Sequence, residues 1–275
     1  MPDREFPAAV KGVADALQKA VQTVEAEDDW DMRRPSVRSA HDGIVSILDR
    51  ADRTLRNDEI TALLAKTDLR ERLIQLNARL HSVTEIAFAR SAISGPADRD
   101  PFEGSWINRG FTDLLIGQVA QWRRCGSLEA RRQRIAIVGG GALPQTQVFL
   151  ARALGCDTVS VERDPEAAEL SRKMLAWTGV RNAQVEVADG SDFDFGGCTI
   201  VAVATLVRQK SVISRQVAMT APQATFAPRN AVGAHAMWRE TIDEESVLSQ
   251  GWRLSDAWVP AGSTVASHTY RTLDC

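Results

Sequence analysis

Three consecutive glycines, Gly139, Gly140 and Gly141, follow a short apolar run, Ile-Ala-Ile-Val, which is typical of a buried strand. Glycines between a strand and a helix allow a tight turn and let a cofactor approach the backbone, as in dinucleotide and S-adenosylmethionine sites. Here Leu143 and Pro144 occupy the place where the third glycine of an NAD motif would pack the helix on the strand. The pattern disfavours NAD and is compatible with S-adenosylmethionine.

Acidic side chains follow the next two predicted strands. Glu162 comes directly after the second strand, where a carboxylate would accept hydrogen bonds from ribose hydroxyls, and Asp164 is close behind. Asp189 follows the third strand and could meet the amino group of an adenine. The alternative is that all three are solvated strand-end carboxylates. Their order behind one glycine turn favours a cofactor site.

A polar pair interrupts an apolar row on the clearest predicted helix, residues 68–93. His81 and Glu85 are one turn apart, and Ile74, Ala78 and Phe88 continue the same row. A carboxylate beside an apolar face has a raised proton affinity and can take a proton from an incoming ammonium group. The alternative is a helix-surface pair that contributes about 0.3 to 0.5 kcal/mol.

An arginine and an asparagine follow the apolar run at residues 225–228. Arg229 would lie at the carboxyl end of the sheet, where α/β folds place ligands. Its guanidinium could bind a carboxylate bidentately, and Asn230 could bind an α-amino group. The alternative for Arg229 is an ordinary surface arginine.

The residue pattern of the chain changes near residue 125. Residues 5–124 are rich in Ala, Leu, Arg, Glu and Asp and predict helices, whereas the remainder alternates between strand and helix patterns. We therefore predict an α/β protein with an all-α N-terminal domain, residues 1–125, and a Rossmann-like domain with a parallel central sheet, residues 126–275. The predicted strands are 135–138, 158–161, 183–187, 199–204 and 225–228, the helices are 147–154 and 165–178, and closing strands come from 246 onward.

Composition excludes several classes of function. With 33 Lys and Arg against 36 Asp and Glu, the net charge is −3, so the chain has no basic field for nucleic acid. Four scattered cysteines and four unclustered histidines predict neither a disulfide framework nor a metal site. Without a long apolar segment, neither secretion nor a membrane span is expected, and the predicted location is the cytoplasm.

Several segments together resemble nicotianamine synthases. That family has a similar Gly-x-Leu-Pro-x-Thr turn, matched here through Thr146, and an Ala-Leu-Val segment that resembles the stretch with Ala204 and Leu206. An Arg-x-Ala-x-Gly-Ala segment begins here at Arg229, and Glu85 stands on the acidic position of the family's N-terminal helix. The resemblance covers residues 69–240. It implies a class I S-adenosylmethionine-binding domain.

The resemblance also implies an unusual use of the cofactor. Members of this family let an amine attack the γ-carbon of the methionyl part, which transfers a 3-amino-3-carboxypropyl group and releases methylthioadenosine. In this reading Glu85, with His81 beside it, handles the proton. Bacterial relatives that build staphylopine and pseudopaline do this once, on histidine. The expected partner is a small amine or amino acid, and a homodimer is left open.

Departures from the family pattern concern the acceptor. The tyrosine-rich segment of the plant enzymes is replaced by one with Phe102 and Trp106, and Val232 stands where the family has a histidine. Synthesis of nicotianamine from three cofactor molecules is therefore not expected. Phe102, Trp106 and Phe111 can form an apolar cover, with a cation–π contact to the sulfonium, or can simply pack in the core.

Three alternative hypotheses about the function remain open. If the cover excludes an acceptor, the cofactor's own α-amine can close azetidine-2-carboxylate, as in dedicated enzymes of natural-product pathways. The second reading is an ordinary small-molecule methyltransferase. The third is a module that binds the cofactor or a partner without turnover, although such a module has no need of His81 and Glu85 in an apolar row.

Overall fold

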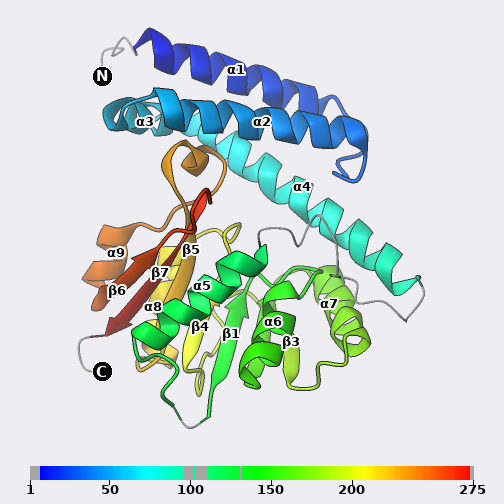
Figure 1. Cartoon of the computed structure of the whole chain (residues 1–275), viewed down its shortest axis with the longest axis vertical. Helices are drawn as coiled ribbons and strands as arrows, with labels where there is room; N and C mark the ends of the chain where they lie inside the picture. Colours follow the sequence, from blue (N-terminus) through cyan, green and yellow to red (C-terminus); the bar gives the residue numbers. More distant parts are fainter. Residues whose placement is uncertain (1–6, 96–101, 103–110, 131, 273–275) are drawn as a thin grey trace. The chain divides into compact units, whose positions relative to one another are not determined.

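The computed structural model describes residues 7–95, 102, 111–130 and 132–272. Its first helices are α1 (Ala8–Glu25), α2 (Pro35–Thr54), α3 (Asn57–Leu64) and α4 (Thr67–Ile93), and strands begin only after α5 (Phe111–Arg124). This order confirms the predicted α/β class with helices at the N-terminus (Figure 1). The chain forms two compact units, Met1–Thr84 with Ala231–Glu240, and Glu85–Asn230 with Thr241–Cys275.

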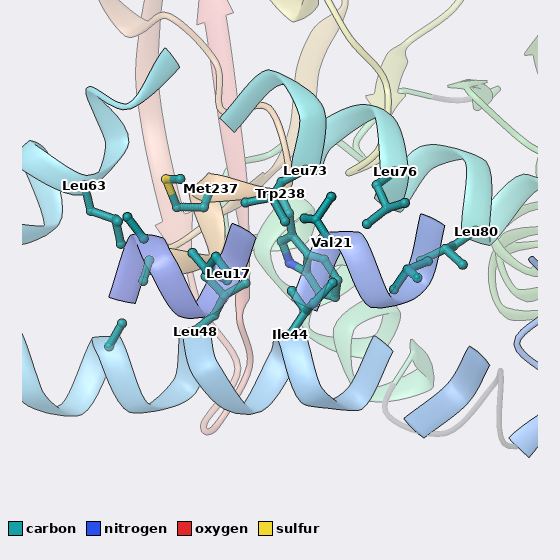
Figure 2. Close-up of a cluster of buried hydrophobic side chains, with 14 of the residues drawn as sticks. Leu17, Val21, Ile44, Leu48, Leu63, Leu73, Leu76, Leu80, Met237 and Trp238 are labelled. Carbon is teal, nitrogen blue, oxygen red and sulfur yellow. The ribbon is translucent and has the colours of Figure 1, made fainter. Parts of the chain in front are cut away.

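The first unit is built on amphipathic helices. Buried residues of α1 recur at steps of three and four, which places them on one stripe. They join a core that Figure 2 shows closing around a tryptophan. The residues labelled there are Leu17, Val21, Ile44, Leu48, Leu63, Leu73, Leu76, Leu80, Met237 and Trp238.

A short segment from the far end of the chain completes this core. It contains the 3-10 helix η2 (Gly233–Met237), and Asn77 Nδ2 donates to Trp238 O at 3.0 Å. His235 Nε2 lies 2.8 Å from Asp49 Oδ1. The compact units therefore do not coincide with the expected boundary at residue 125, because 231–240 belongs with the helices and 85–125 with the sheet.

The second unit contains a seven-stranded sheet in the order β3-β2-β1-β4-β5-β7-β6. The pairs β1–β2, β2–β3, β1–β4 and β4–β5 are parallel, and β6–β7 is antiparallel. The strands are β1 (Arg134–Val138), β2 (Asp157–Glu162), β3 (Ala183–Val187), β4 (Ile200–Val203), β5 (Thr225–Ala231), β6 (Trp252–Trp258) and β7 (Val265–Thr272). The remaining helices are α6 (Gln145–Leu154), α7 (Pro165–Trp177), α8 (Lys210–Thr220) and α9 (Glu244–Ser249).

Alternate side chains of the central strand face two separate cores. Ile135 and Ile137 of β1 cluster with Trp122 of α5. Val138 clusters instead with Ile213 of α8, so α5 and α8 cover opposite faces of the sheet. Burial on both faces explains why these strands read as continuous apolar runs in the sequence.

The largest difference between a predicted and an observed strand is in β5. The predicted strand ends at Pro228, but β5 continues to Ala231. Pro228 pairs with Val203, the last residue of β4, so the three residues after Pro228 extend past the carboxyl end of the neighbouring strand. Arg229 therefore belongs to the strand itself, at the carboxyl end of the parallel strands, where the ligand was expected.

Among the residues that the structure describes, no helix combines the length and apolarity needed to cross a membrane.

Candidate functional site

The glycine turn follows β1 and approaches its neighbours closely. Gly139 has a φ of +77°, and its N–H donates to Val161 O at 2.9 Å. A Cβ on Gly139 would lie 2.2 Å from Val207 Cγ2, and a Cβ on Gly140 would lie 1.8 Å from Ser160 Oγ. Only glycine fits at these positions, because any larger residue would collide with the strand or with the turn after β4.

Glu85 lies against this turn. A Cβ on Gly141 would be 2.3 Å from Glu85 Oε2, and the backbone N–H of Ala142 donates to the Glu85 carboxylate. Gly141 N also donates to Glu162 Oε2 at 2.9 Å, so the two carboxylates meet around one backbone turn. The sequence-predicted acid of the helix and the sequence-predicted glycines are thus one site.

Burial first, and then the negative charge of Glu162, raise the pKa of Glu85 to about 8. Glu85 is half-buried, so its carboxyl is shielded from water on the side of the turn. At neutral pH it carries a proton in the absence of a cation. A cationic ligand would favour the charged carboxylate, which can then accept a proton.

This raised pKa predicts a pH-dependent cost to folding. Glu85 ionises near its ordinary pKa in the unfolded chain but near 8 in the folded one, so unfolding becomes easier as the pH rises between these values. Glu85→Gln should remove the cost, and the melting temperature of the variant relative to the parent should increase between pH 5 and pH 9. The expected gain at pH 9 is at most about 5 kcal/mol, because each pKa unit between 4.5 and about 8 corresponds to about 1.4 kcal/mol. A difference in melting temperature that does not change with pH contradicts the assignment.

Gly141→Ala tests the contact between the turn and Glu85. Gly141 has a φ of +64°, so alanine costs about 1 to 2 kcal/mol of strain, and its Cβ would displace the end of the Glu85 side chain. We expect turnover to fall at least tenfold with only a modest loss of stability. Gly155→Ala is the matched control, because Gly155 has a φ of +61° and no atom of the described residues lies within 4 Å of the added Cβ. If both variants lose turnover equally, the displacement of Glu85 is not the cause.

The three predicted acidic positions have different surroundings. Glu162 ends β2, and its carboxylate accepts from Gly141 N and, at 3.0 Å, from Asp164 N. Asp164 is the N-cap of α7 and accepts from two backbone N–H groups of its first turn. Asp189 follows β3 and accepts from Ser191 N at 2.9 Å, which lowers its pKa. The structure brings Glu162 to the glycine turn and gives Asp164 a local structural role.

Arg229 is a buried cation with neutral partners. It is 2% exposed, and burial lowers its pKa to about 10. Its Nη2 donates to Gln118 Oε1 at 2.8 Å, and its Nη1 donates to Thr146 Oγ1 at 3.3 Å. The guanidinium carbon lies 5.2 Å from the centre of the Phe111 ring. Among the described residues, no carboxylate forms an ion pair with Arg229, so the site can hold a ligand anion.

Asn230 faces away from Arg229, because successive residues of a strand point to opposite faces. Its Oδ1 accepts from Ile242 N at 3.0 Å, and its Nδ2 lies 3.1 Å from His268 Nδ1. The structure therefore does not bring Asn230 together with Arg229. Its bonds connect β5 to Ile242 and to His268 of β7.

The remaining positions of the predicted turns lie at the same edge. Leu143 is in the core, Pro144 is the N-cap of α6, and Thr146 is in the first turn of that helix. Ala204 and Leu206 lie in the turn after β4, where Ala204 N donates to Val138 O at 3.0 Å. The turn after β4 thus packs against the glycine turn through Val207.

The predicted aromatic cover is described only in part. Phe102 is 6% exposed and packs in the apolar cluster of Ala142 and Leu143, which is a core position. Phe111 begins α5 and contacts Arg229. Trp106 lies outside the described residues.

His81 belongs to the first unit. Its ring centre is 6.1 Å from that of His41, and its Nε2 is buried with no hydrogen-bond partner among the described residues. Burial, with the charge of Arg239, lowers the pKa of His81 to about 3. His81 is therefore neutral at physiological pH and is a far weaker base than Glu85, whose pKa is about 8.

Sequence reasoning missed Gln118. Its signal was visible, because Gln118 and Gln121 stand at apolar-face positions of α5, between Leu114 and Trp122. Two glutamines on a buried stripe predict hydrogen bonds inside the core. Gln118 accepts such bonds from Arg229.

Comparisons with solved structures support the fold. A structure of MtNAS, a nicotianamine synthase, in complex with MTA and tNA aligns with a TM-score of 0.79 at 21% identity, covering 98% of this chain and 99% of that one. A glutamate-to-glutamine variant of MtNAS in complex with S-adenosylmethionine aligns with a TM-score of 0.78 at 20% identity, over 94% of this chain and 97% of that one. No protein-family model matches the chain, and no curated protein is significantly similar to it.

The sheet is also similar to that of methyltransferases. Magnesium protoporphyrin IX methyltransferase from Synechocystis, with bound S-adenosylmethionine, aligns with a TM-score of 0.50 at 12% identity, over 73% of this chain and 97% of that one. The fold is thus a class I S-adenosylmethionine-type Rossmann fold preceded by helices. The likeness to MtNAS over nearly the whole chain confirms the predicted resemblance at the level of the fold.

Proposed function

We propose that this protein binds S-adenosylmethionine at the glycine turn and transfers its 3-amino-3-carboxypropyl group to an amine, with release of methylthioadenosine. The observation that carries the proposal is the Glu85 carboxyl, placed on the turn at Gly141 with a pKa of about 8. Methyl transfer to a neutral or acidic acceptor has no need of a second carboxyl beside Glu162. An amine acceptor needs a group that removes its proton.

Features of this chain fit the cofactor. The glycine turn leaves its backbone without any Cβ, as an S-adenosylmethionine site requires, and Glu162 stands at the end of β2 beside it. The buried Arg229 can bind the methionyl carboxylate. The MtNAS structures with S-adenosylmethionine and with MTA, in the same fold, support this assignment.

The proposed reaction is a displacement at carbon. The nitrogen lone pair of the acceptor forms a bond to the γ-carbon of the methionyl group, the carbon–sulfur bond breaks, and its electron pair stays on sulfur as methylthioadenosine leaves. Because an amine arrives mostly as ammonium at neutral pH, the Glu85 carboxylate accepts its proton before the attack, which frees the nitrogen lone pair. The cationic sulfonium nearby favours the ionised form of Glu85.

Incubation with S-adenosylmethionine, alone and with amino acids, tests the proposal by mass spectrometry of the products. Methylthioadenosine that forms only with an added amine supports transfer. Methylthioadenosine with azetidine-2-carboxylate, from the cofactor alone, would assign the nucleophile to the cofactor's own α-amine. S-adenosylhomocysteine instead of methylthioadenosine rejects the proposal in favour of methyl transfer, and binding without turnover rejects any enzymatic role.

A further inference from the structure

The guanidinium group of Arg229 is held in one orientation by uncharged side chains. Gln118 Oε1 accepts from Arg229 Nε at 3.3 Å and from Nη2 at 2.8 Å, so the amide binds two donors of the guanidinium fork. Thr146 Oγ1 accepts from Nη1 at 3.3 Å. Buried arginines are normally paired with carboxylates, because an uncompensated charge is costly to bury. Here the described partners fix the direction of the guanidinium and leave its charge in place.

The amide of Gln118 is itself held in one orientation. Gln118 is 1% exposed, and its Nε2 donates to Ser267 Oγ at 3.0 Å. If the amide were turned over, its NH₂ group would face the donors of Arg229, which are all N–H groups. On the same helix, Gln121 Nε2 donates to Ser267 O at 3.0 Å and ties α5 to β7. Gln118 therefore presents its oxygen to Arg229.

The choice of an amide matters for what can bind. A glutamate at this position would have the same shape and would form a bidentate ion pair with Arg229, so that a ligand carboxylate would compete with a built-in one. An amide accepts the same hydrogen bonds without neutralising the cation. The positive charge is then available only to a ligand that brings an anion to the guanidinium, which lies over the Phe111 ring.

We propose that Gln118 is a positioning residue that keeps Arg229 unpaired for the methionyl carboxylate, and that it thereby makes the site selective for sulfonium ligands that carry a carboxylate. This inference rests on the proposed function, since it assumes that S-adenosylmethionine is the ligand. It predicts that the parent protein binds S-adenosylmethionine at least tenfold more tightly than decarboxylated S-adenosylmethionine. It assigns selectivity to a residue that need not touch the ligand.

Gln118→Glu tests the inference through ligand selectivity. Dissociation constants are measured by calorimetry for S-adenosylmethionine, its decarboxylated form and methylthioadenosine. We expect the variant to lose at least tenfold in affinity for S-adenosylmethionine and to change less than threefold for the two ligands without a carboxylate. An equal loss for all three ligands, or an unchanged preference for the carboxylated one, overturns the inference.

Thr146→Asp gives a second route to the same test if Gln118→Glu does not fold. It places a carboxylate at the other contact of Arg229, in the first turn of α6, where a negative charge is tolerated. The same loss of selectivity is expected, and its absence counts against the inference. If the parent protein releases methylthioadenosine but a folded variant keeps full selectivity, the role of Gln118 is refuted and the proposed function still stands. A parent that does not bind S-adenosylmethionine refutes the proposed function as well.

Discussion

Glu85→Gln is expected to lower the turnover number by ~100-fold or more, the usual contribution of a general base. Binding of S-adenosylmethionine should weaken much less, by about tenfold at most, because only the ionised carboxylate attracts the sulfonium. The loss is limited since Glu85, with a pKa of about 8, is already protonated in the unliganded protein at neutral pH. Glutamine has nearly the shape and charge of that protonated form, so it should preserve the turn at Gly141 while removing the proton acceptor.

The measurement is steady-state release of methylthioadenosine, together with the dissociation constant of S-adenosylmethionine. Glu169→Gln is the matched control, because Glu169 lies on α7 at the surface and pairs only with Arg172 and Lys173 among the described residues. That control should keep full turnover. A Glu85→Gln variant as active as the parent removes Glu85 from the mechanism, and a variant that loses binding and turnover equally points to a structural role.

Arg229→Met should weaken binding of S-adenosylmethionine by ~100-fold. Methionine fills much of the buried space without the charge, so the methionyl carboxylate would enter the site without a cation. Removing one partner of a buried, hydrogen-bonded charge pair costs about 2 to 5 kcal/mol, and each 1.4 kcal/mol is about tenfold in affinity. Methylthioadenosine, which has no carboxylate, should bind nearly as well as it does to the parent.

Calorimetric titration of both ligands provides the test, and Arg172→Met is the control. Arg172 also donates two hydrogen bonds to a single acceptor, Val185 O, but it lies on α7 beside the outer strand β3. Its replacement should leave both affinities unchanged. If Arg229→Met binds S-adenosylmethionine as tightly as the parent, the carboxylate is held elsewhere and the assignment of Arg229 is wrong.

Much of the sheet could be predicted from local patterns. The strands at 135–138 and 183–187 were expected within a residue of their observed bounds, because buried parallel strands are short apolar runs between turn residues. The glycine turn could be predicted because the pattern changes from strand to helix around Gly139. Glu162 could be placed at the same end of the sheet because parallel strands end there. These features depend on contacts between residues that are close in sequence, and such contacts produce patterns of composition and spacing that can be recognised.

Long-range contacts could not be predicted in the same way. Residues 231–240 join the first unit through bonds such as that from Asn77 to Trp238, which are separated by 161 positions, and no local pattern predicts such a pairing. The sequence did not predict that β5 continues through Arg229 and Asn230, because neither side chain is apolar. Both side chains are nevertheless buried, and specific hydrogen bonds satisfy their polar groups. Gln118 is the same case on a helix. Buried polar groups look like surface residues until their partners are known.

The most direct test of the account uses S-adenosylmethionine with ¹³C in its S-methyl group, added to the purified protein with a pool of amino acids. If an amine attacks the γ-carbon of the methionyl chain, all of the label should leave in methylthioadenosine, and the new amine product should be unlabelled. Label in the acceptor, with unlabelled S-adenosylhomocysteine as the second product, would show that the methyl group is transferred and would contradict the account.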